Sequence, residues 1–168
     1  MNDTYKSILA LRANRSFADE PITPDDLARV LEAARWTGSS KNTQNWSFIV
    51  VDDPEQKETL CSAGDFTTPI RNAPAAICLV ENPSGYEFDT GRLAQNIMLA
   101  ADALGLATCP ITLHRDELAG QILELPDGYR CRYAVAIGYP SPTQRTVFAA
   151  GGRKPISELV HRNTFNGS

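Results

Sequence analysis

Three short polar segments carry side chains suited to binding an anionic, planar ligand. They are residues 12–17 (RANRSF), 38–46 (GSSKNTQNW) and 151–155 (GGRKP). Arginine makes fork-shaped, charge-assisted hydrogen bonds to phosphate. Ser, Asn and Gln both donate to and accept from the polar edge of a heterocycle. Since the chain is acidic overall, cations gathered in these segments point to a small basic pocket for an anion.

Each segment alone also fits a plainer role. Arg12 and Arg15 fit ordinary surface charges, residues 39–40 fit a loop that ends a helix, and residues 151–152 fit a flexible tail. Trp46, beside an apolar stretch, fits a core residue better than a ring stacked on a cofactor. The occurrence of all three segments in one small chain is what favours a ligand site.

The composition predicts a single globular domain over residues 1–168. Hydrophobic residues make up 42% of the chain and charged residues 21%, which is ordinary for a domain with its own core. The net charge of -4 argues against a nucleic-acid partner, because such binding needs a basic face. The N-terminus lacks the layout of a signal peptide, and no apolar run is long enough to span a bilayer. We therefore expect a cytoplasmic protein with no membrane partner.

Cysteines and histidines are few and scattered. They are Cys61, Cys78, Cys109, Cys131, His114 and His161. No zinc or iron–sulfur spacing is present, so we expect no metal site. The cysteines are expected to be small core residues.

The elements that must position these segments follow from hydrophobic spacing and from helix signals. Thr23 before Pro24 predicts a helix start, and Gly105 ends a long central helix. Helices are expected over 5–13, 24–36, 54–62, 89–104, 114–123 and 155–160, and buried strands over 46–51, 75–80, 107–112 and 133–138. Residues 64–72 are expected to form a loop with room for one helical turn. The alternation predicts an α+β fold in which helices cover a mixed β-sheet.

Two polar arms fit this plan less well. Residues 12–17 and 143–154 are rich in Arg and Gly and have no evident core to join. An exposed arm either extends into solvent or packs on another molecule. We expect the C-terminal arm to pack on a partner subunit.

The motifs occur in an order that resembles the FMN-dependent nitroreductase family. The matching stretches are RxxRxF at 12–17, AAR at 33–35, SSxNxQxW at 39–46, DTGRLAQN at 89–96, IGYP at 137–140 and RKPI at 153–156. The likeness covers essentially the whole chain. SSxNxQxW and RKP are specific in combination, whereas RxxRxF alone is not.

The resemblance implies a nitroreductase-like homodimer with exchanged terminal segments and FMN held at the interface. Arg12, Asn14 and Arg15, with Arg153 and Lys154, would hold the phosphate and ribityl chain. Ser39, Ser40 and Asn42 would reach the flavin of the other subunit, with Gln44 near by. The backbone of Pro110, Ile111, Thr112 and Leu113 would lie against the isoalloxazine ring, where N–H groups tune the flavin.

The chain departs from the family pattern at several positions. Leu11-Arg12-Ala13 stands where the family usually has Arg-Arg-Ser, so one arginine and one hydroxyl are missing from the phosphate side. Gly38 replaces a proline and should loosen its loop. Asn45 replaces the proline of Gln-Pro-Trp. The helical insertion of larger relatives is missing, so residues 64–72 and 82–88 are left to shape the substrate side.

The implied activity is an FMN-dependent oxidoreductase driven by NADH or NADPH. The donor would pass a hydride to the flavin, and a nitroaromatic, quinone or similar acceptor would then occupy the same place in a ping-pong cycle. No catalytic side chain is required, because the flavin carries the electrons and solvent supplies protons; His114 fits a helix start. Two alternatives stay open: a flavin-binding protein without nicotinamide turnover, and specialised flavin-dependent dehydrogenation or a flavin-consuming enzyme.

Overall fold

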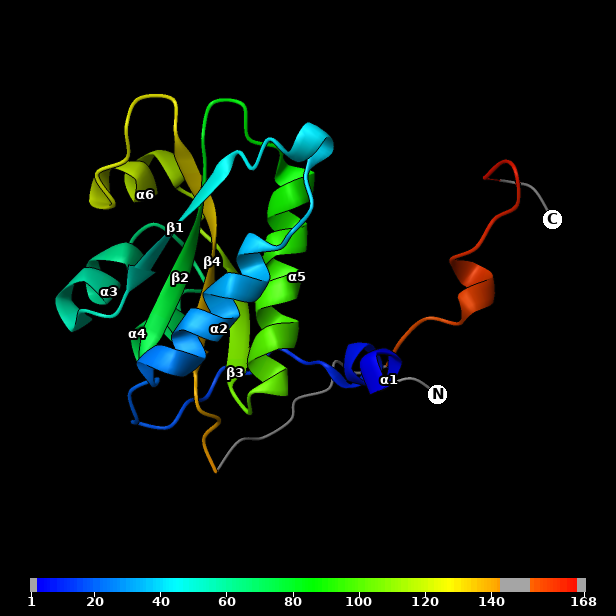
Figure 1. Cartoon of the computed structure of the whole chain (residues 1–168), viewed down its shortest axis with the longest axis horizontal. Coiled ribbons are helices and arrows are strands. Elements are labelled where there is room, and N and C mark those ends of the chain that lie inside the picture. Colours follow the sequence, from blue (N-terminus) through cyan, green and yellow to red (C-terminus); the bar gives the residue numbers. More distant parts are fainter. Residues whose placement is uncertain (1–2, 143–151, 166–168) are drawn as a thin grey trace.

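The computed structural model describes residues 3–142 and 152–165, and an antiparallel sheet lies at its centre (Figure 1). The strands are β1 (Trp46–Val51), β2 (Ala75–Glu81), β3 (Ala107–Thr112) and β4 (Arg130–Gly138), in the order β1-β2-β4-β3. All three neighbouring pairs are antiparallel. The expected α+β class is confirmed, but the expected mixing of strand directions was wrong.

The connections between strands explain the antiparallel pairing. Two helices, α3 (Pro54–Cys61) and α4 (Thr68–Asn72), lie between β1 and β2 and return the chain to the end where β1 finishes. Val51 therefore pairs with Ala76. Alternation of strands and helices predicts layers, but it leaves the strand direction open.

Helices cover both faces of the sheet. On one face, α2 (Pro24–Arg35) and α5 (Glu87–Ala103) enclose a core with β2 residues such as Ile77 and Leu79. On the other face, α3, α4 and α6 (Asp116–Ile122) enclose a second core. That second core contains all four cysteines, which are buried and free, as predicted.

Local sequence signals explain where α2 begins and where α5 ends. Thr23 Oγ1 accepts a hydrogen bond from Asp26 N–H over 3.1 Å, and Pro24 is the first residue of α2. Gly105, at φ +75°, ends α5 in the left-handed conformation that favours glycine. The helix α5 has 17 residues, so it is about 25 Å long.

Several expected boundaries were wrong because tertiary contacts override local pattern. The first helix, α1, covers Asp3–Ala10 and ends earlier than expected. α6 begins at Asp116, so His114 lies in the loop before it. β1 is half-buried rather than buried, because it is an edge strand. The expected C-terminal helix is only a 3₁₀ turn, η2 (Ile156–Glu158).

The N-terminal polar arm was also wrongly expected to have no core to join. Phe17 packs against the core and forms a β-bridge with Pro140, and Asn14 is buried. Residues 143–151 of the expected C-terminal arm lie outside the described residues.

The two terminal segments lie to one side of the sheet (Figure 1). The helix α1 buries none of its residues, and every described residue from 152 to 165 is exposed. Large apolar side chains on these segments face solvent: Tyr5, Ile8, Leu9, Ile156, Leu159, Val160 and Phe165. Within the described ranges, no helix has the length and apolar character needed to cross a bilayer.

Candidate functional site

The segment that follows α1 lies along the start of β3. Asn14 N–H donates to the Thr108 carbonyl over 2.7 Å, and Asn14 Oδ1 accepts from Ser16 N–H over 2.9 Å. Arg12 donates to the Leu9 carbonyl at the end of α1 over 2.8 Å. These bonds fix the segment against the sheet and hold the Arg12 side chain beside the helix end.

Arg15 is a neighbour of the same strand. Burial raises the pKa of the Cys109 thiol, while the positive charge of Arg15 acts in the opposite direction. A cavity of about 320 Å³ lies beside the segment and is lined by Arg12, Asn14, Asp102, Thr108 and Pro140 among others. The structure thus brings Arg12, Asn14 and Arg15 together at the start of β3.

Residues 110–113, which are predicted to lie against the isoalloxazine ring, form the end of β3 and the residue that follows it. Within the described residues, β3 pairs with β4 alone. Leu113 N–H donates to the Arg132 carbonyl over 2.8 Å. Because successive N–H groups of an extended chain point in opposite directions, Thr112 N–H faces the open edge. Pro110, which has no N–H to leave unpaired, is well suited to an edge strand.

The geometry of this edge suits a long ligand. Five residue steps separate Thr108 from Leu113, or about 17 Å of strand. The edge is therefore long enough for a ligand with a phosphate at the Arg12 and Arg15 end and a planar ring at the Thr112 end.

The loop that carries Ser39 and Ser40 lies at the other end of α5. Arg92, near the start of α5, donates from its guanidinium to the Gly38 carbonyl over 2.6 Å. Asp102, near the end of α5, lines the cavity beside Arg12. These helix residues are ten positions apart, about 15 Å along the axis. The structure does not bring the loop and the Arg12 segment together within one chain.

The loop itself has an unusual backbone. Lys41, Asn42 and Gln44 have φ values of 52°, 54° and 49°, a left-handed conformation that costs non-glycine residues about 1–3 kcal/mol each. Ser39 Oγ accepts from Gln44 N–H over 3.0 Å, and Gln44 Nε2 donates to the Asn42 carbonyl over 3.3 Å. Strained residues concentrate at functional sites, so the backbone independently marks Lys41, Asn42 and Gln44 as part of a candidate site.

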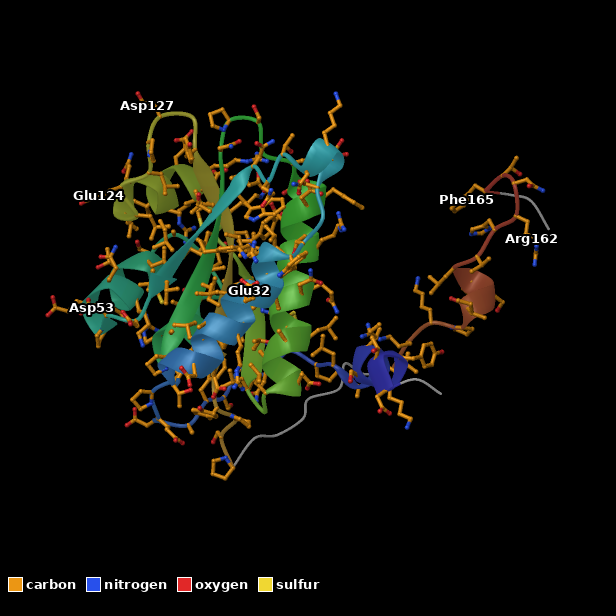
Figure 2. All side chains as sticks on the ribbon, in the orientation of Figure 1. Glu32, Asp53, Glu124, Asp127, Arg162 and Phe165 are labelled. Carbon is orange, nitrogen blue, oxygen red and sulfur yellow. The ribbon has the colours of Figure 1, made fainter. Side chains whose placement is uncertain are left out.

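Arg153 and Lys154 lie on the exposed C-terminal segment. Figure 1 shows that segment away from β3, and Figure 2 shows Arg162 and Phe165 farther along it. The structure therefore does not bring Arg153 or Lys154 to the β3 edge of their own chain.

Sequence reasoning missed two residues that shape the site. Thr108 holds Asn14, and Arg92 holds Gly38. Arg92 belongs to the DTGRLAQN stretch, but no spacing rule pairs it with a glycine 54 positions earlier. Both contacts depend on tertiary structure.

Comparison with known proteins places the chain in a family. The sequence profile of the Nitroreductase family matches residues 8–79 and 68–139. The chain is 30% identical over 151 residues to an Archaeoglobus fulgidus protein whose name proposes an NADH dehydrogenase or NAD(P)H nitroreductase, covering 83% of this chain and 87% of the relative. It is 28% identical to FMN reductase (NADPH) of Bacillus subtilis, covering 99% and 76%. The solved FMN-dependent nitroreductase from Clostridium difficile R20291 is 26% identical with a TM-score of 0.82, covering 95% and 98%. On this evidence, the chain belongs to the nitroreductase family.

Proposed function

We propose that this chain is an FMN-dependent oxidoreductase that takes electrons from NADH or NADPH and passes them to nitroaromatic, quinone or similar acceptors. The observation that carries the proposal is the open edge of β3, with cations at its start and the Thr112 N–H near its end. Relatives named FMN reductase (NADPH) and FMN-dependent nitroreductase support the same cofactor. A cytoplasmic location accords with the use of reduced nicotinamides.

The residues along this edge fit FMN. The guanidinium groups of Arg12 and Arg15 suit a phosphate, and Asn14 holds their segment on Thr108. Thr112 N–H can donate to the polar edge of a flavin ring laid against residues 110–113. Bound FMN supplies hydride and electron transfer, which no side chain provides. The chain binds and orients the ring, and the reaction requires no catalytic side chain.

We also propose that the working unit is a homodimer with exchanged terminal segments. Ile156, Leu159 and Val160 are 74%, 58% and 57% exposed, and such apolar surface calls for a cover. The edge strand β1 is only half-buried, and a groove of about 400 Å³ lies between it and α2. A second copy of the chain supplies apolar terminal segments, which can pack into this groove beside β1.

The dimer also accounts for the separation of the predicted site residues. Ser39, Ser40, Asn42 and Gln44 of one subunit would reach the flavin on β3 of the other. Arg153 and Lys154 would complete the phosphate site. These residues lie apart within one chain. They can therefore all contact one FMN only if two subunits contribute to its site.

A flavin-binding protein without nicotinamide turnover is the second candidate. Leu11 and Ala13 pack partly buried against the core, and neither side chain can bond a phosphate. A weakened phosphate site favours a carrier that exchanges its flavin. Specialised flavin-dependent dehydrogenation or a flavin-consuming reaction is the third.

The absorbance spectrum of the purified protein, with and without NADH or NADPH in the absence of oxygen, tests the proposal. We expect oxidised-flavin bands that bleach within seconds. Bands that persist would support a carrier, or specialised chemistry with another reductant. A protein that takes up no flavin after incubation with FMN would contradict the proposed function.

A further inference from the structure

A second cavity lies at the end of the sheet where β1 finishes and β2 begins. Its volume is about 480 Å³, and it is lined by residues 18–22, the start of α3 and the link from α4 to β2. Figure 1 shows α3, α4 and the beginning of α2 gathered at this end of β2. Since β4 separates β2 from β3, the cavity is distinct from the outer edge of β3. None of the described residues that line it belongs to the proposed flavin site.

Lys57 of α3 is a buried cation that lines this cavity. It is only 7% exposed, and its ammonium donates to the Ala73 carbonyl over 2.5 Å and to the Pro74 carbonyl over 3.3 Å. Among the residues that the structure describes, no carboxylate forms an ion pair with it. Buried lysines are almost always paired. Because an ammonium has three N–H donors, holding the link from α4 to β2 leaves one N–H and an unneutralised charge for a ligand.

Carboxylates lie along the exposed side of the same cavity. Asp19, Glu20 and Asp52 line it and are themselves exposed, so we refer to these three as the acidic rim. Arg71 also lines the cavity, but its guanidinium donates to both carboxylate oxygens of Glu58. The cavity therefore combines a buried positive group with an exposed negative rim. Opposite charges placed in this way complement a zwitterion and disfavour a simple anion or a simple cation.

The rest of the lining is largely apolar and stiff. Pro21, Pro54 and Pro74 all contribute to it, and the ring of each proline fixes its own φ. Ile22 and Leu27 add half-buried aliphatic side chains. Small-molecule sites are typically preformed apolar cavities in which a few polar groups fix the orientation of the ligand. This cavity has that character.

We propose that the cavity is a second ligand site, which binds an α-amino acid with an apolar side chain. The Lys57 ammonium donates to the carboxylate of the ligand. The acidic rim accepts from the ammonium group of the ligand, and the apolar side chain packs against Ile22, Leu27 and the proline-lined wall. The site does not depend on the proposed flavin chemistry.

Calorimetric titration with three matched probes tests the proposal. The probes are L-leucine, 4-methylpentanoate, which lacks the ammonium group, and 3-methylbutylamine, which lacks the carboxylate. None of them is aromatic, so none can stack on a flavin ring, and the full chain is first incubated with FMN. We expect saturable binding of L-leucine and about 10- to 100-fold weaker binding of the other two, the effect of losing a hydrogen bond to a charged group. Absence of saturable heat with L-leucine would overturn the proposal, as would equal affinity for all three probes.

Neutralising the acidic rim gives a variant whose substitutions are all exposed. Asp19→Asn, Glu20→Gln and Asp52→Asn combined should weaken L-leucine binding by about 10-fold or more, while 4-methylpentanoate should bind at least as tightly as before. The matched control removes three exposed carboxylates on or after α6, two of which Figure 2 labels beside that helix: Glu117→Gln, Glu124→Gln and Asp127→Asn. The control should bind L-leucine as the wild type does. Wild-type affinity in the rim variant would contradict the proposal.

Lys57→Met tests the buried end of the site. A folded Lys57→Met protein should lose about 10- to 100-fold in affinity for both L-leucine and 4-methylpentanoate, and affinities like those of the wild type would refute the assignment of Lys57. This substitution also removes the bonds to the Ala73 and Pro74 carbonyls. If the variant does not fold, the three probes and the rim variant decide the proposal.

Discussion

Arg92 of α5 donates a hydrogen bond to the carbonyl oxygen of Gly38 over 2.6 Å. The bond anchors the loop that holds Ser39 and Ser40 to the start of the longest helix. Because glycine leaves the backbone free to rotate, the bond from Arg92 restrains the loop at this position.

Removing this anchor should weaken flavin binding. We expect Arg92→Met to raise the Kd for FMN about 2- to 10-fold, since one hydrogen bond contributes about 0.5–1.5 kcal/mol. Flavin fluorescence quenching measures the Kd, and Arg29→Met, on the exposed face of α2, controls for the loss of a positive charge. An unchanged Kd in a folded Arg92→Met protein would remove the loop from the flavin site.

Local chemistry predicts most elements of this fold, and tertiary contacts decide the rest. Thr23 and Pro24 start α2 as expected, and the bounds of β1 and β3 match their apolar runs. Asn14 was assigned to a free arm because its partner, the carbonyl of Thr108, is remote in the sequence. No local pattern indicates that pairing.

The candidate site, like the fold, could be predicted only in part from the sequence. Residue types indicated the phosphate and ring segments, because guanidinium and amide groups have limited uses. Spacing could not indicate that Arg12 and Ser39 lie at opposite ends of α5. The resemblance assigned them to different subunits' flavins.

Arg153 provides a direct test of the exchanged tail. Arg153→Ala should weaken FMN binding by about 1.5–3 kcal/mol, as expected for a hydrogen bond to a charged group. Arg162→Ala, in the same exposed segment, should have little effect. Equal FMN affinities in both variants and the wild type would exclude Arg153 from the phosphate site.

The oligomeric state tests the shared site as a whole. Sedimentation of the wild type should show a dimer without a stable monomer. A charged pair of substitutions, Ile156→Asp with Leu159→Asp, should shift the protein toward monomer, because these two exposed positions would no longer offer an apolar surface to a partner. FMN should be lost in parallel. A wild-type monomer that retains FMN would contradict the exchange.

An ion pair between a half-exposed arginine and a buried carboxylate should contribute to the stability of the β2–β4 region. Arg130 donates to Glu81 Oε2 over 2.8 Å, and the Thr90 hydroxyl donates to Glu81 Oε1. The Glu81 side chain is only 5% exposed, so Arg130→Ala leaves a buried carboxylate short of partners and should cost about 1–3 kcal/mol of unfolding free energy. Arg132→Ala breaks a half-exposed contact with Glu87 at 3.7 Å and should cost less than about 1 kcal/mol. Urea denaturation separates the two; equal losses would contradict the assignment.

The buried thiol of Cys78 should make the fold sensitive to alkali. Its hydrogen bond with Cys131, and then burial, raise the Cys78 pKa well above the ordinary value. Because the folded-state pKa is the higher one, the stabilisation is complete below the unfolded pKa of about 8.5 and is lost as the pH rises through the folded pKa. Urea midpoints should therefore fall from pH 8 to pH 10 in the wild type and fall less in Cys78→Ala. Cys61→Ala, compared at pH 7, corrects for the packing lost with a core thiol. An identical alkaline loss in Cys78→Ala would show that another group is responsible.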